Sequence, residues 1–327
     1  MSVASPERTI PKVLLADIGG TNARFALLAR GTVSPIVHMA VRDYGSFEEA
    51  LATYLAGIPE AGTIGVAVLA VAGAVQNGRC ALTNNPWVID AAGLRATCDF
   101  STVRLINDFE AVAWSLPRLS PGKLRQIGGR QPVVGAPRAA LGPGTGLGMA
   151  ASIPHGGGHL VLSSEGGHST MAGSSLREDA VIAYLRQRLG HVSAERVLSG
   201  PGLENLHEAL AALDDVKLPR LSAAEITRAG VEGTCATSRA AVDMFCAMLG
   251  TVAGNLALTL GARGGIFIGG GILRHMPEYL VSSPFRTRFE EKGRQRKYLE
   301  PIPAYLILDE DAAFVGLRSL AEVENIG

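Results

Sequence analysis

Two glycine-rich turns of the same design, each set between two apolar segments, constrain this chain more than any other feature. The first turn carries Asp17, Ile18, Gly19, Gly20 and Thr21 and joins the apolar residues 13–16 to the apolar residues 25–28. Glycine lets a ligand approach the backbone closely, and consecutive N–H groups in such a turn form an anion-binding concavity. Taken alone, the turn could equally belong to an ordinary hairpin.

The second turn lies in residues 139–151, where glycines at 142, 144, 146 and 148 surround Thr145. A dinucleotide-binding fingerprint needs the spacing G-x-G-x-x-G before a helix, and that spacing is missing here. A P-loop needs a lysine directly after its last glycine, and no lysine lies nearby. Two turns that each present backbone N–H groups and a threonine hydroxyl predict a duplicated phosphate-binding device instead.

The charge balance and the apolar runs limit the possible partners and the location of the protein. Thirty basic and thirty acidic residues cancel, which argues against nucleic acid or an anionic membrane as a partner. The longest apolar run, residues 64–75, is too short to span a bilayer, and residues 1–12 lack the apolar core of a signal peptide. The four cysteines have no metal-ligand spacing, so we expect reduced thiols in a cytoplasmic protein.

Two segments predict neighbouring strands that end in polar residues. Residues 64–71 are almost continuously apolar, which is typical of a strand buried on both faces. Residues 103–106 form a second short strand, followed directly by Asn107 and Asp108. Ligands of open α/β sheets bind beyond the carboxyl ends of the strands, so these two side chains are candidate ligand contacts. Asp108 could also cap the helix that follows, and the two roles are compatible.

Helical periodicity and capping patterns predict most of the remaining elements. We expect helices over residues 46–58, 175–189, 203–213, 234–260 and 312–323, a further helix capped at Ser222, and strands within residues 264–272 and 302–308. Capping boxes are predicted at Ser46 with Glu49 and at Ser175 with Glu178. The many small residues of 234–260 suit close packing against a neighbour. Residues 119–137 are interpreted as the passage into a second domain, the charged run 286–297 as a solvated helix face, and Trp87 as a packing anchor.

A polar segment at residues 163–168 predicts hydrogen bonding to a polyhydroxylated ligand. Its Glu165 carboxylate and His168 imidazole can together accept and donate hydrogen bonds. A zinc site is disfavoured, because His155, His159 and His168 lie on glycine loops without a rigid helical spacing or a cysteine partner.

Taken together, the motifs resemble the ATP-dependent glucokinases of bacteria. The resemblance rests on ordered segments that cover nearly the whole chain: residues 17–24, 82–84, 106–109, 142–148, 165–168, 191–202 and 269–272. Ala74 departs from the family, which usually has proline there, and the sequence after Thr83 and Asn84 is variable. No cysteine cluster is present like the one that holds zinc in a sister group of sugar kinases and repressors, which favours the zinc-free group.

The resemblance implies a fold and a division of the chain. It implies an α/β protein with the two-domain actin-like ATPase fold (ribonuclease H-like) and an interdomain cleft. The small domain would comprise residues 1–118 plus 309–327, and the large domain residues 119–308. ATP with Mg²⁺ would be the phosphoryl donor, glucose the acceptor, and the enzyme a cytoplasmic homodimer of glycolysis.

The resemblance also implies roles for individual residues. Asn107, Asp108, Glu165, His168 and Glu195 would contact the sugar, with Asp108 as the catalytic base. Asp17, through water, would face Mg²⁺. The nucleotide would be held by Asp17, Ile18, Gly19, Gly20, Thr21, Gly144, Thr145, Gly146, Gly269, Gly270 and Gly271. Two alternatives stay open at this point: a kinase for another hexose or an amino sugar, and a non-catalytic sugar sensor.

Overall fold

The computed structural model describes residues 12–58, 64–82 and 85–324. Two compact units divide the chain: unit 1 consists of Met1–Arg118 together with Asp311–Gly327, and unit 2 is Leu119–Glu310. The predicted contact loop at Thr83 and Asn84 lies outside the described residues, as does most of the N-terminal segment that was judged unlike a signal peptide.

Unit 1 is built on a six-stranded sheet in the order β3-β2-β1-β5-β8, with β4 also paired to β2. Its strands are β1 (Lys12–Ile18), β2 (Asn22–Ala29), β3 (Thr32–Val33), β4 (Val37–Ala40), β5 (Ile64–Val71) and β8 (Thr102–Asn107). The first glycine turn joins the antiparallel pair β1–β2, while β1, β5 and β8 run parallel. The carboxyl ends of the three parallel strands therefore meet at one edge.

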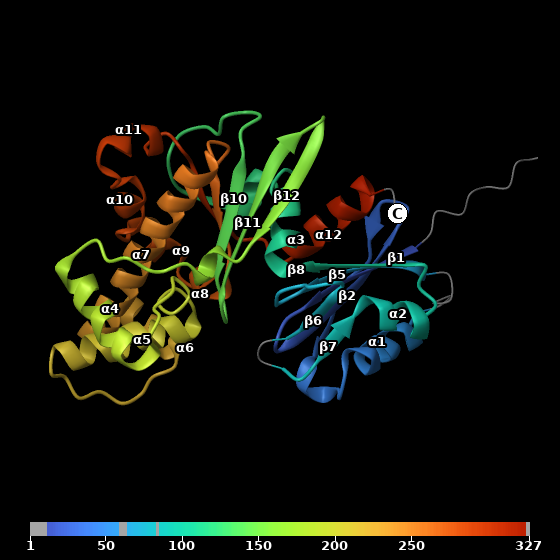
Figure 1. Cartoon of the computed structure of the whole chain (residues 1–327), viewed down its shortest axis with the longest axis horizontal. Coiled ribbons are helices and arrows are strands. Elements are labelled where there is room, and N and C mark those ends of the chain that lie inside the picture. The colour runs from blue at the N-terminus through green and yellow to red at the C-terminus, as the bar shows by residue number, and fades with distance from the viewer. Residues whose placement is uncertain (1–11, 59–63, 83–84, 325–327) are drawn as a thin grey trace, which may run out of the picture. The chain divides into compact units, whose positions relative to one another are not determined.

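Helices cover both faces of this sheet. Its helices are α1 (Phe47–Ala56), α2 (Ala91–Thr97), α3 (Asp108–Ser115) and α12 (Ala312–Val323). Along β1, Leu14 faces the core cluster that contains α1 and α2, whereas Val13 and Leu15 face the cluster that contains α12. Figure 1 shows α1 and α2 on one side of the sheet and α3 and α12 on the other. The sheet is thus buried on both faces, as the apolar run of β5 predicts. A two-stranded sheet of β6 (Arg79–Ala81) and β7 (Val88–Asp90) completes unit 1.

Unit 2 repeats this strand plan. Its sheet has the order β12-β11-β10-β13-β14-β9. The strands are β9 (Leu124–Gly128), β10 (Arg138–Pro143), β11 (Leu147–His155), β12 (Gly158–Ser164), β13 (Ile266–Ile268) and β14 (Ala304–Ile307). The second glycine turn joins the antiparallel pair β10–β11, and β13 and β14 follow parallel to β10. Each unit therefore carries a glycine turn at the carboxyl end of its first central strand.

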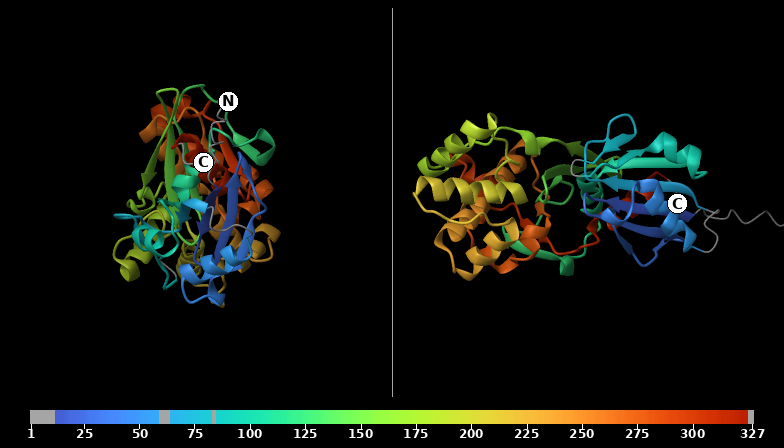
Figure 2. Two further views of the ribbon diagram at one scale, coloured as in Figure 1. Left: turned by 90° about the vertical axis from the view of Figure 1, so that its right-hand side faces the viewer. Right: turned by 90° about the horizontal axis from the view of Figure 1, so that it is seen from below.

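The helices of unit 2 are α4 (Leu176–Leu189), α5 (Gly200–Leu213), α6 (Ala223–Glu232), α7 (Ala236–Leu260), α8 (Gly271–Arg274), α9 (Pro277–Ser282), α10 (Phe285–Glu290) and α11 (Arg296–Leu299). Three of them, α5, α6 and α10, pack directly against the long helix α7. Figure 2 shows the group α4–α7, yellow-green to orange, beside the strands of this unit. Within the described residues α7 is long and apolar enough to cross a membrane, but 67% of its most apolar window is buried inside the protein, as in a core helix.

Glycines of α7 allow the close packing that its composition predicts. A Cβ on Gly250 would lie 2.2 Å from the carbonyl oxygen of Phe285, and one on Gly254 would lie 2.5 Å from that of Phe289. Both distances are far below any normal contact, so α10 lies directly on the backbone of α7.

The predicted elements are largely confirmed, with local corrections at the helix starts. Residues 64–71 and 312–323 form β5 and α12 with the expected bounds. At α1, Ser46 caps the helix, but Glu49 accepts its hydrogen bond from Gly45 N rather than from Ser46 N, so only half of the predicted box forms. At α4, Glu178 likewise accepts from Ser174 N.

Four further findings complete the comparison with the predicted elements. The capping box of Ser222 and Glu225 is complete, and Trp87 is buried against Phe47 as a packing anchor. The passage 119–137 contains the strand β9, which the sequence did not predict. The charged run 286–297 is only in part a solvated face. Arg294, Arg296 and Lys297 are exposed, whereas Arg286 and Arg288 are largely buried and bond to Ile302 O and to the Glu178 carboxylate.

Candidate active site

The first turn, the loop after β5 and the residues after β8 lie next to one another at the carboxyl ends of the parallel strands of unit 1. Strand register aligns Ile18 with Val71 and Val71 with Asn107. The Asn107 side chain accepts a hydrogen bond from Phe109 N at 2.9 Å and donates one to Gly73 O at 3.1 Å. Asn107 therefore caps α3 and fixes the loop after β5, and the predicted cap at position 108 is corrected to position 107.

Asp108 is the first residue of α3 and is half-buried. Its Oδ1 accepts a hydrogen bond from its neighbour Phe109 N at 2.8 Å. The pKa of the Cys80 thiol is raised by burial and, to a smaller extent, by the negative charge of Asp108. Asp108 therefore places a carboxyl group directly after the carboxyl end of β8, the edge strand of this sheet.

Asp17 is held by an arginine directly across the hairpin. Arg24 is its register partner on β2 and donates from Nε to Asp17 Oδ2 at 3.0 Å and also from Nη2. Arg24 in turn pairs with Asp311 at 3.3 Å and lies over the ring of Phe314. Both hydrogen bonds use Oδ2, and among residues 12–58, 64–82 and 85–324 none is donated to Oδ1, which can accept from a water molecule of hydrated Mg²⁺. The residues thus fit the outer-sphere role that was predicted for Asp17.

In unit 2 the second turn and the glycines after β13 lie against each other. Gly269 N donates to Leu141 O at 2.9 Å. Gly270 has a φ of +104°, and a Cβ there would lie 2.1 Å from Pro143 O. Glycine at position 270 is therefore required by the fold itself, because no side chain fits between these two backbones.

Gly144 and Gly19, in contrast, are not required by the chain. A Cβ on Gly144 would meet nothing within 4 Å, and one on Gly19 would make only an ordinary contact of 3.6 Å with Asn22 O. Neither residue has a backbone angle that excludes other residues. A glycine that the fold does not need is consistent with a ligand that approaches the backbone at that point.

The predicted sugar contacts of unit 2 form one cluster around His168. His168 is the last residue of the short 3₁₀ helix η4 (Gly166–His168), which begins after Glu165. His168 Nε2 lies 3.7 Å from Glu165 Oε2, and His168 Nδ1 lies 3.9 Å from Glu195 Oε1. Both distances exceed a hydrogen bond. The side chains of Glu165, His168 and Glu195 are 66%, 62% and 28% exposed, so their polar atoms can bind a hydroxylated ligand.

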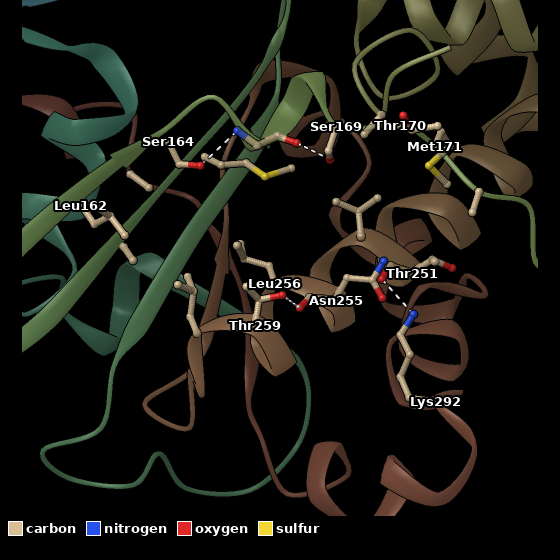
Figure 3. Close-up of a pocket in the computed structure, with 18 of the residues that line it drawn as sticks. Leu162, Ser164, Ser169, Thr170, Met171, Thr251, Asn255, Leu256, Thr259 and Lys292 are labelled. Carbon is tan, nitrogen blue, oxygen red and sulfur yellow. Dashed lines mark hydrogen bonds between the residues drawn. The ribbon is translucent and has the colours of Figure 1, made fainter. Parts of the chain in front are cut away.

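A separate cavity of about 460 Å³ lies beside this cluster in unit 2. Figure 3 shows that β12, the segment after η4, α7 and Lys292 contribute to its wall. Lys292 donates to Thr251 O at 3.1 Å. None of the predicted site residues lines the cavity, so it is distinct from the candidate active site.

The predicted residues thus form two sets, one at the sheet edge of unit 1 and one in unit 2. Sequence reasoning missed the pairing of Arg24 with Asp17, although counting residues back from the turn would have placed them opposite each other. It also missed the close approach of Gly167, within the motif 165–168, to Leu147: a Cβ on Gly167 would lie 2.1 Å from Leu147 O. Nothing in the local sequence indicates that contact, because the two residues meet only in the folded unit.

Comparison with known proteins identifies the chain. The family model for Glucokinase matches residues 14–324. A glucokinase of Paramagnetospirillum magneticum is 48% identical over 94% of this chain and 97% of its own length, and one of Chromobacterium violaceum is 45% identical over 98% and 91%. The crystal structure of a glucokinase from an Antarctic psychrotroph superposes with a TM-score of 0.85 at 35% identity, covering 96% of this chain and 99% of that one.

A ROK-family glucokinase of Streptomyces griseus, solved with glucose and AMPPNP, shares the fold at 19% identity, with a TM-score of 0.63 over 95% of this chain and 99% of that one. Fold and site together define a sugar kinase of the actin-like ATPase fold. The chain belongs to the glucokinase family. It is an enzyme that phosphorylates glucose to glucose 6-phosphate with ATP.

Proposed function

We propose that Asp108 is the base of this reaction. Its carboxylate accepts the proton of the glucose 6-hydroxyl while that oxygen attacks the γ-phosphorus of ATP, and ADP leaves. The position of Asp108 at the carboxyl end of β8 carries this proposal, since ligands of open α/β sheets bind there. Phosphoryl transfer depends on positioning and electrostatics more than on a strong base, so an ordinary carboxylate is sufficient.

The other hydroxyls of glucose bind to Asn107, Glu165, His168 and Glu195 in this proposal. Support comes from the cluster around His168, whose members face each other without using their hydrogen-bonding capacity on one another. A sugar that lacks a matching hydroxyl would leave these polar groups unpaired, which provides specificity. Asn107 binds glucose through the second N–H of its Nδ2 and the second lone pair of its Oδ1, since the first of each is used by Gly73 O and Phe109 N.

The nucleotide is held by backbone N–H groups of both glycine turns in this proposal. Residues 17–21 and 144–146 bind the phosphates, and Gly269, Gly270 and Gly271 lie along the adenosine. Gly144 supports the assignment, since the fold leaves open space where its side chain would be. When bound, Mg²⁺ neutralises charge on the phosphoryl oxygens. Asp17 would hold one of its water molecules, with Arg24 fixing the orientation of the carboxylate.

The biological setting is also part of the proposal. Residues 1–118 plus 309–327 and residues 119–308 act as the two domains, and two copies of the chain form a homodimer. The enzyme works in the cytoplasm at the entry of glucose into glycolysis. The resemblance to bacterial glucokinases supports these points. Light scattering of the purified chain would measure its mass and test the dimer.

Substitution of Asp108 by asparagine tests the catalytic assignment. Loss of the base should lower kcat by about 10²–10⁴-fold while glucose still binds. Glu110→Gln is the matched control, because Glu110 is a half-buried carboxylate of the same helix with no proposed contact to glucose. A coupled assay of ADP release, run with glucose, mannose, fructose and glucosamine, also measures the sugar preference. Near-normal turnover by the Asp108→Asn variant would contradict the proposal.

A further inference from the structure

The carboxylate of Glu195 contacts two parts of unit 2 that have different proposed ligands. Its Oε1 faces His168 Nδ1 at 3.9 Å, on the sugar side. Its Oε2 accepts a hydrogen bond from Leu147 N at 2.9 Å, at the end of the second glycine turn. One carboxylate thus faces the proposed sugar contacts with one oxygen and the proposed phosphate turn with the other.

The carboxylate lies directly against the backbone of the turn. A Cβ on Gly146 would lie 2.5 Å from Glu195 Oε2, so glycine at position 146 lets the carboxylate reach the backbone. The Leu147 carbonyl is enclosed as well, because a Cβ on Gly167 would lie 2.1 Å from it. The residues around Leu147 are therefore packed against both η4 and Glu195.

The backbone around Glu195 is tied to the same two elements. Glu195 N donates to Gly167 O at 2.9 Å. Four residues further on, Ser199 Oγ donates to Glu195 O at 2.8 Å, and Gly200 N donates to Gly144 O at 2.8 Å. Because these hydrogen bonds join the three segments, a displacement of Glu195 or of η4 would also shift the backbone of the second turn.

We propose that Glu195 is a positioning residue that couples glucose binding to nucleotide binding within unit 2. A glucose hydroxyl that donates to Oε1 fixes the carboxylate, and the fixed carboxylate holds Leu147 N and the turn at 144–146 in the conformation that binds phosphate. Glucose then raises the affinity for the nucleotide, and by linkage the nucleotide raises the affinity for glucose by the same factor. This inference rests on the proposed function, which places glucose and phosphate at these two ends.

Binding of the non-hydrolysable ATP analogue AMPPNP with Mg²⁺, measured by calorimetry with and without saturating glucose, tests the coupling. In the Glu195→Gln variant a neutral acceptor replaces the charged one, and charge-assisted hydrogen bonds are roughly twice as strong as neutral ones. The sugar-free dissociation constant for AMPPNP should therefore rise about 3- to 10-fold. The factor by which glucose improves AMPPNP binding should fall to less than about half its wild-type value.

Glu165→Gln is the matched control. Glu165 belongs to the same cluster, but no hydrogen bond joins its side chain to the turn within the described part of the chain. This variant should weaken glucose binding and keep the wild-type sugar-free affinity for AMPPNP. An unchanged sugar-free affinity in Glu195→Gln, an unchanged glucose effect there, or an equal loss in Glu165→Gln would overturn the inference. Near-normal turnover by the Asp108→Asn variant, with the AMPPNP results as expected, would instead contradict the proposed catalytic base and leave the coupling intact.

Discussion

Arg288 donates two hydrogen bonds to the carboxylate of Glu178, from Nη1 at 2.6 Å and from Nη2 at 3.1 Å. The two side chains are only 13% and 4% exposed, and a further bond from Arg288 to Thr251 Oγ1 at 3.0 Å ties α10 to α7. Removing one partner of a buried pair leaves the other charge uncompensated. Arg288→Met should therefore lower the free energy of unfolding by about 3–5 kcal/mol, measured by denaturant titration.

Arg294→Met is the control for this prediction. Arg294 belongs to the same charged run but is exposed, in the 3₁₀ helix Gly293–Gln295. Its replacement should change the free energy of unfolding by no more than about 0.5 kcal/mol. Equal effects of the two variants would show that the pair of Arg288 and Glu178 does not stabilise unit 2.

This pair also shows where sequence reasoning reached its limit in the fold. Periodicity and capping patterns lie within one element, so β5, α12 and the long helix α7 could be predicted from their own residues. The partner of Arg288 lies 110 residues away. The sequence pattern of a charged run is the same whether its side chains are solvated or paired with a distant carboxylate, so the pattern alone does not predict burial. Strand β9 was missed for the same reason, since its pairing with β14 is a long-range contact.

The candidate site could be predicted only in part for a related reason. Motifs located the glycine turns, Asp108 and the cluster of Glu165, His168 and Glu195, because each motif is contiguous in sequence. The contacts that hold these residues are not contiguous. Leu147 N and Glu195 are 48 residues apart, and only the folded unit shows that the turn and the sugar cluster share a hydrogen bond.

Gly144→Ala should separate nucleotide binding from folding. The methyl group would meet open space in the protein, so the thermal midpoint should stay within about 2 °C of wild type. At the proposed phosphate turn the same methyl group would block close approach of a phosphate, and KM for ATP should rise about 10-fold or more, a loss of about 1.4 kcal/mol. Steady-state kinetics at saturating glucose would measure it.

Gly122→Ala is the matched control, because a Cβ there also meets nothing within 4 Å and Gly122 lies outside both turns, in the 3₁₀ helix Pro121–Lys123. KM for ATP should be unchanged in this variant. The phosphate assignment of the second turn would be wrong if both variants kept the wild-type KM.

Asp17→Asn should change the dependence of activity on Mg²⁺. The amide keeps the size of the side chain but removes the negative charge that would orient a water molecule of the metal, and it weakens the bonds from Arg24. Loss of such outer-shell partners typically costs about 10- to 100-fold in metal affinity or activity. We expect the Mg²⁺ concentration for half-maximal activity to rise about 10-fold or more, with glucose binding in the absence of nucleotide unchanged. Titration of MgCl₂ at fixed ATP provides the measurement.

His207 should make the stability of unit 2 depend on pH. It is buried in α5, and its Nε2 has no hydrogen-bond partner within the described residues. Burial lowers its pKa in the folded protein, because the charged imidazolium would lose its hydration. The unfolded chain, with a pKa of about 6.5, therefore binds a proton more readily. The free energy of unfolding is therefore highest, as far as His207 is concerned, above about pH 6.5. It falls as the pH drops from there toward the lower pKa of the folded state, because the unfolded chain takes up the proton first.

The His207→Leu variant isolates this contribution from the carboxylates that titrate in the same range. Its free energy of unfolding should fall less between pH 7.5 and pH 5.5 (both about one unit from the imidazole pKa of unfolded chains) than that of the wild type. His275→Leu, at an exposed position of the same unit, should keep the wild-type dependence. Denaturant titrations at both pH values measure the difference, and parallel curves for wild type and His207→Leu would mean that protonation of His207 does not oppose folding.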